Sequence, residues 1–174
     1  YYLNLTKEKF FKRLNKIFKK EIVLRIADAY MEDDYLGNKY KNALSNIMSD
    51  WTFGIHALEL LEKNKNNAYG YLYNEPSPIL GGRLGAYHAS ELPYLFGSAV
   101  KKNLREFCSI NSKLLINFFQ KSWTNFAKDG SPSSELFDWK LYKEKSITII
   151  NSSPSSETFR NIDRIKLLHE SKKI

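Results

Sequence analysis

The residues of this chain best suited to chemistry lie in one short stretch, GAYHASELPYLFG, at positions 85–97. His88 has glycine and alanine close by on both sides, and an acidic residue, Glu91, follows it three positions later. Histidine is the side chain that most readily takes and returns protons near neutral pH. The stretch is therefore interpreted either as a general acid–base histidine on a loop or, more plainly, as a loop histidine held by a structural hydrogen bond.

Other reactive side chains lack a suggestive pattern. His56 is expected on a helix surface and His169 in a charged, solvated tail. Cys108 is the only cysteine, which excludes an internal disulfide and a cysteine metal site of the usual spacing, so we expect a buried or incidental thiol. GGRLG, residues 81–85, is not a phosphate-binding loop, because its glycine spacing is wrong and no Lys-Ser/Thr pair follows.

Basic residues outnumber acidic ones, 27 to 19, which gives a net charge of +8 and raises the question of nucleic acid binding. The most basic stretch, TKEKFFKRLNKIFKKE at 6–21, mixes acids with bases and carries apolar residues at helical spacing. It is interpreted as a solvated helix face, with an electrostatic binding patch as the alternative. No recognition motif is present, so no nucleic acid partner is expected.

Membrane and secretion signals are missing from the sequence. No stretch approaches the roughly 20 apolar residues of a membrane span, so none is expected. The first residues lack the basic lead and apolar core of a signal peptide. A single cysteine fits a reducing compartment such as the cytoplasm without proving it, so the localisation stays open.

The elements that must position His88 follow from hydrophobic spacing and turn residues. Thr6 is expected to cap the first helix, and Asp33, Asp34, Gly37 and Asn38 mark a break. Helices are expected, in chain order, over residues 7–19, 21–31, 39–63 with a bend near Gly54, 113–128, and the tail from 161 to 173.

The pattern predicts an α/β chain, mostly helical, with one long strand and a short late strand. Residues 68–74 are expected to form the long strand, and neither of its faces is charged, so both are expected to be covered as in a parallel sheet. The Pro- and Gly-rich segment 75–85 then forms the loop that delivers His88. Residues 146–150 are β-branched and are expected at a sheet edge. Because nothing else offers a partner for strand 68–74, the chain is interpreted as the second half of a domain.

Residues 85–97 resemble the segment around the catalytic histidine of type-B carboxylesterases, an α/β-hydrolase family that includes cholinesterases and bacterial para-nitrobenzyl esterases. The para-nitrobenzyl type is the most similar. WTNFAKDGSPS at 123–133 resembles a second family signature, and SDWTF at 49–53 a weaker third. DWKLY at 138–142 departs from the pattern, with Lys140 in place of the expected proline. The signatures occur in the family's order and cover nearly the whole chain.

The resemblance implies a serine hydrolase acting on small carboxylic esters, with Ser, Glu or Asp, and His in that chain order. His88 occupies the place of the catalytic histidine, which takes the serine proton and returns it to the leaving alcohol. Glu91 is expected to support His88 and not to be the triad acid, which lies far upstream in the family. The apolar run that follows, Leu92 to Phe96, is expected to anchor the loop in the core. No cofactor or metal is implied.

No Gly-x-Ser-x-Gly motif occurs in the sequence, so the nucleophile and the acid are expected in a missing N-terminal part. Residues 1–174 are accordingly interpreted as the C-terminal portion of a single carboxylesterase domain, inactive in isolation. Two alternatives stay open: a non-catalytic carboxylesterase-like remnant or binding module, and a basic module driven by net charge.

Overall fold

The structure is a computed structural model, and it describes residues 5–31, 38–103, 105–159 and 162–172. The chain divides into two compact units: residues 1–63 with 160–174, and residues 64–159. The expected break at Asp33, Asp34 and Gly37 lies outside the described residues. Asn38 lies inside them, and its side chain caps the next helix by accepting the N–H of Lys41 at 2.9 Å.

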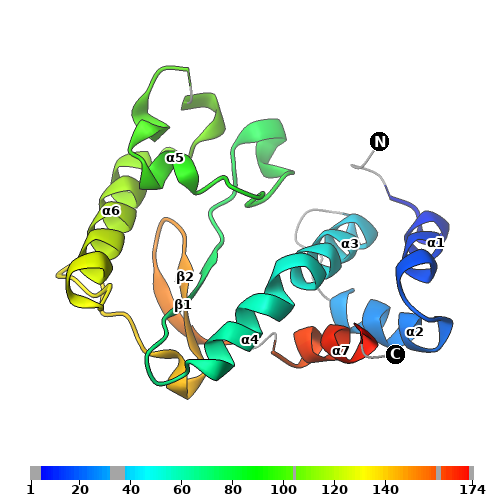
Figure 1. Cartoon of the computed structure of the whole chain (residues 1–174). Helices are drawn as coiled ribbons and strands as arrows, with labels where there is room; N and C mark the ends of the chain where they lie inside the picture. Colours follow the sequence, from blue (N-terminus) through cyan, green and yellow to red (C-terminus); the bar gives the residue numbers. More distant parts are fainter. Residues whose placement is uncertain (1–4, 32–37, 104, 160–161, 173–174) are drawn as a thin grey trace. The chain divides into compact units, whose positions relative to one another are not determined.

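The first unit is helical (Figure 1, blue, cyan and red ribbons). Phe10 and Leu14, one helical turn apart, are completely buried, as are Ile26 and Ile165. The Thr6 hydroxyl accepts a hydrogen bond from the N–H of Lys9 at 3.3 Å, so the predicted cap is confirmed. The helices, all predicted from apolar spacing, are α1 (Lys7–Ile17), α2 (Lys20–Tyr30), α3 (Lys39–Ser49), α4 (Ile55–Lys63) and α7 (Ile162–Lys172).

The bend expected near Gly54 is a π-helical turn, Asp50–Gly54, that joins α3 to α4. A Cβ atom at Gly54 would lie 2.8 Å from Oδ1 of Asp50, so the turn requires glycine there. Asp50 is held in place, because the Tyr30 hydroxyl donates to its Oδ2 at 2.9 Å and Nε of Arg164 lies 3.5 Å from the same oxygen. The π-turn thus connects α2, α3, α4 and α7.

The second unit contains a three-stranded sheet of β1 (Gly70–Tyr73), β2 (Ser146–Ile150) and β3 (Ser155–Thr158), in that order. β1 and β2 are parallel, with Gly70 opposite Ile147, and β2 and β3 are antiparallel. The predicted strand at 68–74 is therefore present, though shorter.

Two expectations about the sheet were wrong. Residues 146–150 form the central strand and not an edge, and they are the partner that β1 was thought to lack. The third strand, SSET, was not predicted, because its serines and glutamate have low strand propensity and it is held by pairing with β2.

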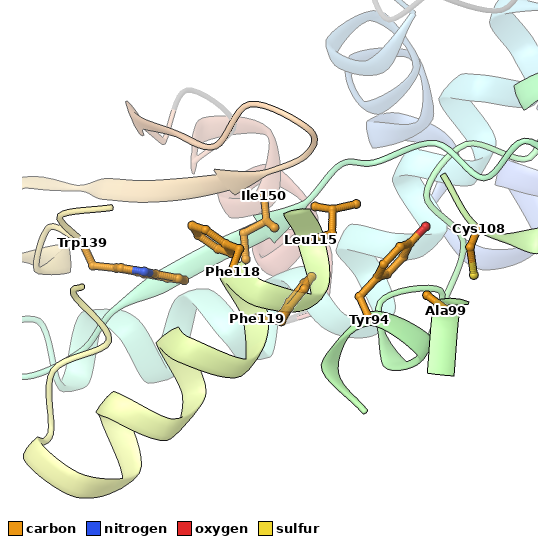
Figure 2. Packing of buried hydrophobic residues seen from close by; sticks show 8 residues of the cluster. All are labelled: Tyr94, Ala99, Cys108, Leu115, Phe118, Phe119, Trp139 and Ile150. Carbon is orange, nitrogen blue, oxygen red and sulfur yellow. The ribbon is translucent and has the colours of Figure 1, made fainter. Parts of the chain in front are cut away.

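Helix α6 (Ser112–Asp129) covers one face of β1. Ring pairs join Tyr73 to Phe119, Tyr71 to Trp123 and Tyr69 to Phe126, with centroids 5.9, 5.2 and 6.3 Å apart. Figure 2 shows the core beneath this helix, where its phenylalanines lie beside Trp139 and Ile150. Both faces stay partly exposed: Tyr71, on the face that α6 contacts, is 45% exposed, and Leu72, on the opposite face, is 44% exposed. The expectation that both faces are covered is therefore not met within the described residues.

Short elements complete the second unit. Helix α5 (Leu92–Leu95) follows the His88 segment and packs on α6. The 3₁₀ turns are η2 (Ile79–Gly82), η3 (Ser98–Val100), η4 (Arg105–Phe107) and η5 (Tyr142–Glu144). The α/β class expected from the sequence is confirmed by this combination of a mixed sheet and packed helices.

Candidate active site

The loop that carries His88 leaves β1 at its C-terminal end and returns to the core at α5. Its first residues are fixed to the sheet: the N–H of Asn74 donates to the carbonyl of Ile150 at 2.8 Å. The carboxylate of Glu75, which is buried, accepts the N–H of Ser152 at 2.7 Å. The loop therefore begins just after β1 at two consecutive residues, Asn74 and Glu75, that are hydrogen-bonded to β2 and to the residues that follow it.

The middle of the loop is a series of tight turns. Gly81, Gly82 and Gly85 all have positive φ, and the N–H of Gly85 donates to the carbonyl of Gly82 at 2.9 Å. Left-handed backbone of this kind favours glycine. The GGRLG stretch thus serves the turn itself, in agreement with the sequence argument against a phosphate loop.

His88 lies on the exposed surface, at the second position of a β-turn closed by the N–H of Ser90 donating to the carbonyl of Tyr87 at 3.0 Å. Ala89, at the third position, has φ of +64° while His88 does not have positive φ, which is the type II pattern. That position normally takes glycine, and other residues are strained there. A strained turn beside an exposed histidine is the kind of feature that gathers at functional sites.

Glu91 is half-buried just before α5. Burial raises the pKa of Tyr71, and the negative charge of Glu91 raises it further. Burial likewise raises the pKa of Tyr73, with smaller contributions from Tyr94, Glu75 and Glu91. The Glu91 carboxylate therefore lies within electrostatic reach of the β1 tyrosines, and its predicted supporting role for His88 stays a prediction.

The apolar run after His88 anchors the loop through one residue and not along its whole length. Tyr94 is buried, whereas Leu92 and Phe96 are exposed. The reason is that α5 forms a single turn, which turns only one side toward α6. The Tyr94 hydroxyl accepts the N–H of Ser109 at 2.7 Å, so this anchor is a hydrogen bond as well as a ring contact.

The other reactive residues lie elsewhere. His56 is exposed on α4, as predicted, with Nδ1 3.8 Å from Oε2 of Glu59. His169, expected to be solvated, is half-buried with Nε2 3.3 Å from Oε1 of Glu59, because α7 packs on α4. Cys108 is buried, as predicted, and burial raises the pKa of its thiol.

Neither of two surface hollows involves His88. One, of about 260 Å³, lies between α4 and α7, and the other, of about 350 Å³, is lined by Tyr69, Ser133, Trp139 and their neighbours. Within the described ranges no three His, Cys, Asp or Glu residues are arranged to hold a metal ion. Over the same residues, the structure has no helix with the length and apolar character that crossing a bilayer needs.

Sequence reasoning missed the buried polar residues at the base of the loop, above all Ser77. The signal was present in EPSPI. Pro76 and Pro78 have no N–H, so Ser77 carries the only backbone donor of the three residues. A serine between two prolines at the root of a glycine-rich loop predicts a fixed attachment point.

Comparisons with known proteins bear on the family and the fold of the chain. A profile described as the carboxylesterase family matches residues 2–167. Among curated proteins, acylcarnitine hydrolase of Rattus norvegicus is 33% identical over 122 residues, which are 62% of this chain and 21% of that protein. Para-nitrobenzyl esterase of Bacillus subtilis is 36% identical over 62 residues, 34% of this chain and 13% of that protein. The aligned residues thus span about a fifth or less of the length of these relatives.

Solved structures show the same fold. A PNB esterase superposes with a TM-score of 0.65 at 23% identity, covering 94% of this chain and 33% of that one. The carboxylesterase of Geobacillus stearothermophilus gives a TM-score of 0.70 at 18% identity, with 94% and 35% covered. The expected resemblance to para-nitrobenzyl esterases and the expected part of an α/β-hydrolase fold are therefore confirmed.

Proposed function

Because the chain belongs to the carboxylesterase family, we propose that it supplies the catalytic histidine of a carboxylic ester hydrolase of the serine type, and that this histidine is His88. The observation that carries the proposal is the turn at 87–90. It holds His88 exposed beside Ala89, a residue in strained left-handed backbone, on a loop fixed to the core at both ends.

In the proposed reaction, His88 acts first as a base and then as an acid. Its imidazole accepts the proton of a serine hydroxyl as the serine oxygen bonds to the ester carbonyl carbon. The same proton then goes to the alkoxide as the carbon–oxygen bond breaks, which releases the alcohol and leaves an acyl-enzyme. A water molecule then gives a proton to the same imidazole as its oxygen bonds to the acyl carbon. That proton passes to the serine oxygen as the acyl–serine bond breaks, which releases the acid and restores the serine. The serine and the buried carboxylate that orients the imidazole would come from sequence that the longer relatives have and these 174 residues lack.

The exposure of His88 is consistent with a serine and a carboxylate that come from another part of the domain. A base must come within about 2.6–3.2 Å of the group it deprotonates. A histidine at the tip of an anchored turn can meet a nucleophile carried by another part of the domain. Glu91 is proposed to support the loop and not to transfer protons, since it follows His88 by only three residues and the acid of the family's triad lies far upstream in the chain.

The proposed substrate class is a small-molecule carboxylic ester. The names of the relatives, an acylcarnitine hydrolase and a para-nitrobenzyl esterase, describe ester substrates of those proteins. The chemistry needs no metal or organic cofactor, because a serine transfers the acyl group and backbone amides can hold the oxyanion. The preference for acid and alcohol is proposed to be set largely by pocket residues that lie outside these 174 residues.

The test is steady-state hydrolysis of a short-chain aryl ester by the full-length protein and by matched histidine variants. His88→Ala should lower kcat by about 10⁴- to 10⁶-fold, as other disruptions of catalytic triads do. His56→Ala, which removes another exposed histidine, should stay within about twofold of the parent. Glu91→Gln should cost less than His88→Ala.

Circular dichroism spectra of all three variants serve as the control for folding. A folded His88→Ala protein within about tenfold of the parent kcat would refute the assignment. A folded but inactive His56→Ala protein would do the same. A folded parent with no esterase activity would favour the non-catalytic relative instead.

A further inference from the structure

Both flanks of the His88 loop are attached to the same three-residue segment, 107–109. The Ser77 hydroxyl, before the loop, donates to the carbonyl of Phe107 at 3.1 Å. The Tyr94 hydroxyl, after the loop, accepts the N–H of Ser109 at 2.7 Å. Cys108 lies between the two attachment points and is buried, as are Ser77 and Tyr94. Two residues that are 17 positions apart in the sequence therefore hold one short stretch of backbone.

Ser77 also closes the first part of the loop. Its N–H donates to the carbonyl of Gly85 at 3.0 Å, and its hydroxyl oxygen accepts the N–H of Ile79 at 3.4 Å. One residue thus fixes the start of the loop, the turn before His88 and the connection to segment 107–109. Its side chain is only 3% exposed, so water competes little for these bonds.

Tyr94 contributes a rigid aromatic anchor. Its ring is 6.2 Å from that of Tyr73 at the end of β1, measured between centroids. Figure 2 shows its hydroxyl directed toward Cys108. Burial raises the pKa of Tyr94, although the hydrogen bond from Ser109 opposes the shift, and burial raises the pKa of Cys108. Both groups therefore stay neutral near pH 7, and the attachment does not titrate in the range where a catalytic histidine works.

We propose that Ser77 and Tyr94 are positioning residues for His88, which hold both ends of its loop on segment 107–109 and so fix where the imidazole lies. The inference rests on the proposed function of His88. A displacement of about 1 Å can cost a catalytic group about 100-fold in rate. Because these two bonds hold the flanks of the loop, loss of either should let the turn at 87–90 move.

The test compares two hydroxyl deletions with matched controls in the full-length protein. Ser77→Ala removes the bond to the carbonyl of Phe107 and the acceptor for the N–H of Ile79. Tyr94→Phe removes the acceptor for the N–H of Ser109 and the hydroxyl contacts with Cys108 and Tyr73. Both changes keep the rest of the side chain. Tyr69→Phe makes the same change on the half-buried tyrosine that precedes β1 and contacts Phe126, outside this attachment. Ser171→Ala removes another serine-to-carbonyl bond, to Leu168 at 2.6 Å on α7, outside this attachment.

Tyr94→Phe and Ser77→Ala should each lower kcat by about 10- to 100-fold at nearly unchanged KM. The rate at which a phosphonate ester modifies the nucleophilic serine should fall by the same factor, because that step also needs His88 as base. The two controls should stay near the parent in both measurements. Parent values of kcat in both deletion variants, with folding intact, would overturn the inference.

Testing Tyr94→Phe in a protein that already carries His88→Ala separates an effect that acts through His88 from a general loss of structure. With His88→Ala already present, Tyr94→Phe should lower the residual rate no further, since there is no imidazole left to position. A loss as large as in the parent background would overturn the inference and assign Tyr94 to packing. If one deletion variant does not fold, the other answers the same question.

The same data separate this inference from the proposed function. Failure of His88→Ala to lower kcat would reject the proposed function itself. A large effect of His88→Ala with none from Tyr94→Phe or Ser77→Ala would leave His88 in place and reject only the positioning residues.

Discussion

At the scale of single residues, the turn at 87–90 depends on the size of Ala89. A left-handed conformation costs an L-residue roughly 1–2 kcal/mol, and a β-branched side chain fits it worst. Ala89→Val should therefore destabilise the full-length protein by about 1 kcal/mol or more. Ala89→Gly should be neutral or slightly stabilising, because the relief of strain offsets the greater backbone entropy of glycine. Urea denaturation of the three proteins provides the free energies of unfolding.

His88→Ala serves as the control for the two variants at position 89, because it changes the neighbouring residue, which does not have positive φ. A valine variant at position 89 as stable as the parent would show that the turn relaxes freely. The small residues around His88 were visible in the sequence, and they correctly indicated a tight turn. Which of them is left-handed could not be read, because alanine carries no conformational signal of the kind that glycine does.

At the scale of elements, the π-turn between α3 and α4 depends on Gly54 and Asp50. A Cβ at position 54 would displace the Asp50 carboxylate, which Tyr30 and Arg164 hold. Disturbing bonds to a partly buried charge costs about 1–3 kcal/mol, more than the ~1 kcal/mol that alanine gains over glycine in a helix. Gly54→Ala should therefore lower the free energy of unfolding, again measured in urea.

The sign of that effect should reverse when the obstacle is removed. In an Asp50→Ala background no carboxylate lies in the way, so Gly54→Ala should stabilise by up to about 1 kcal/mol through helix propensity alone. If Gly54→Ala raised the free energy of unfolding in both backgrounds, the 2.8 Å distance from its Cβ to Oδ1 of Asp50 would not be the reason for glycine at this position.

The helices and strands also show which parts of the fold can be predicted from the local sequence pattern. The helices followed from apolar spacing because i to i+4 contacts are local, and Thr6 followed from capping chemistry. Strand order did not follow, since pairing of Gly70 with Ile147 joins residues far apart in the chain. The same limit hid Ser77 and Tyr94. An anchor was expected from the apolar run that contains Tyr94, and Ser77 was not singled out; their common attachment to 107–109 exists only in the folded chain.

At the scale of the whole molecule, the second unit leaves apolar surface and a strand edge uncovered by the described residues. Ile110 is 99% exposed and Phe96 75% exposed. β1 lies at one end of the sheet order, so one row of its backbone N–H and C=O groups has no strand partner in the described part of the chain. Apolar surface and open strand edges of this kind are sites of association.

These 174 residues expressed alone should therefore bind a hydrophobic dye, associate with themselves and hydrolyse no aryl ester above background. The first two outcomes follow from the exposed surface and edge, because about two-thirds of the length of the solved esterases lies outside the part that this chain matches and is available to cover them. The third follows because the sequence holds His88 but no Gly-x-Ser-x-Gly nucleophile motif, and a base without a nucleophile leaves no acyl-enzyme route. Light scattering, dye fluorescence and a continuous esterase assay measure the three outcomes, with the full-length protein as the positive control.

A monomer that melts cooperatively without binding dye would contradict the expected association. Ester turnover that a serine-directed phosphonate abolishes would require a nucleophilic serine within these 174 residues. It would reject the proposal that His88 works with a serine from another part of the domain.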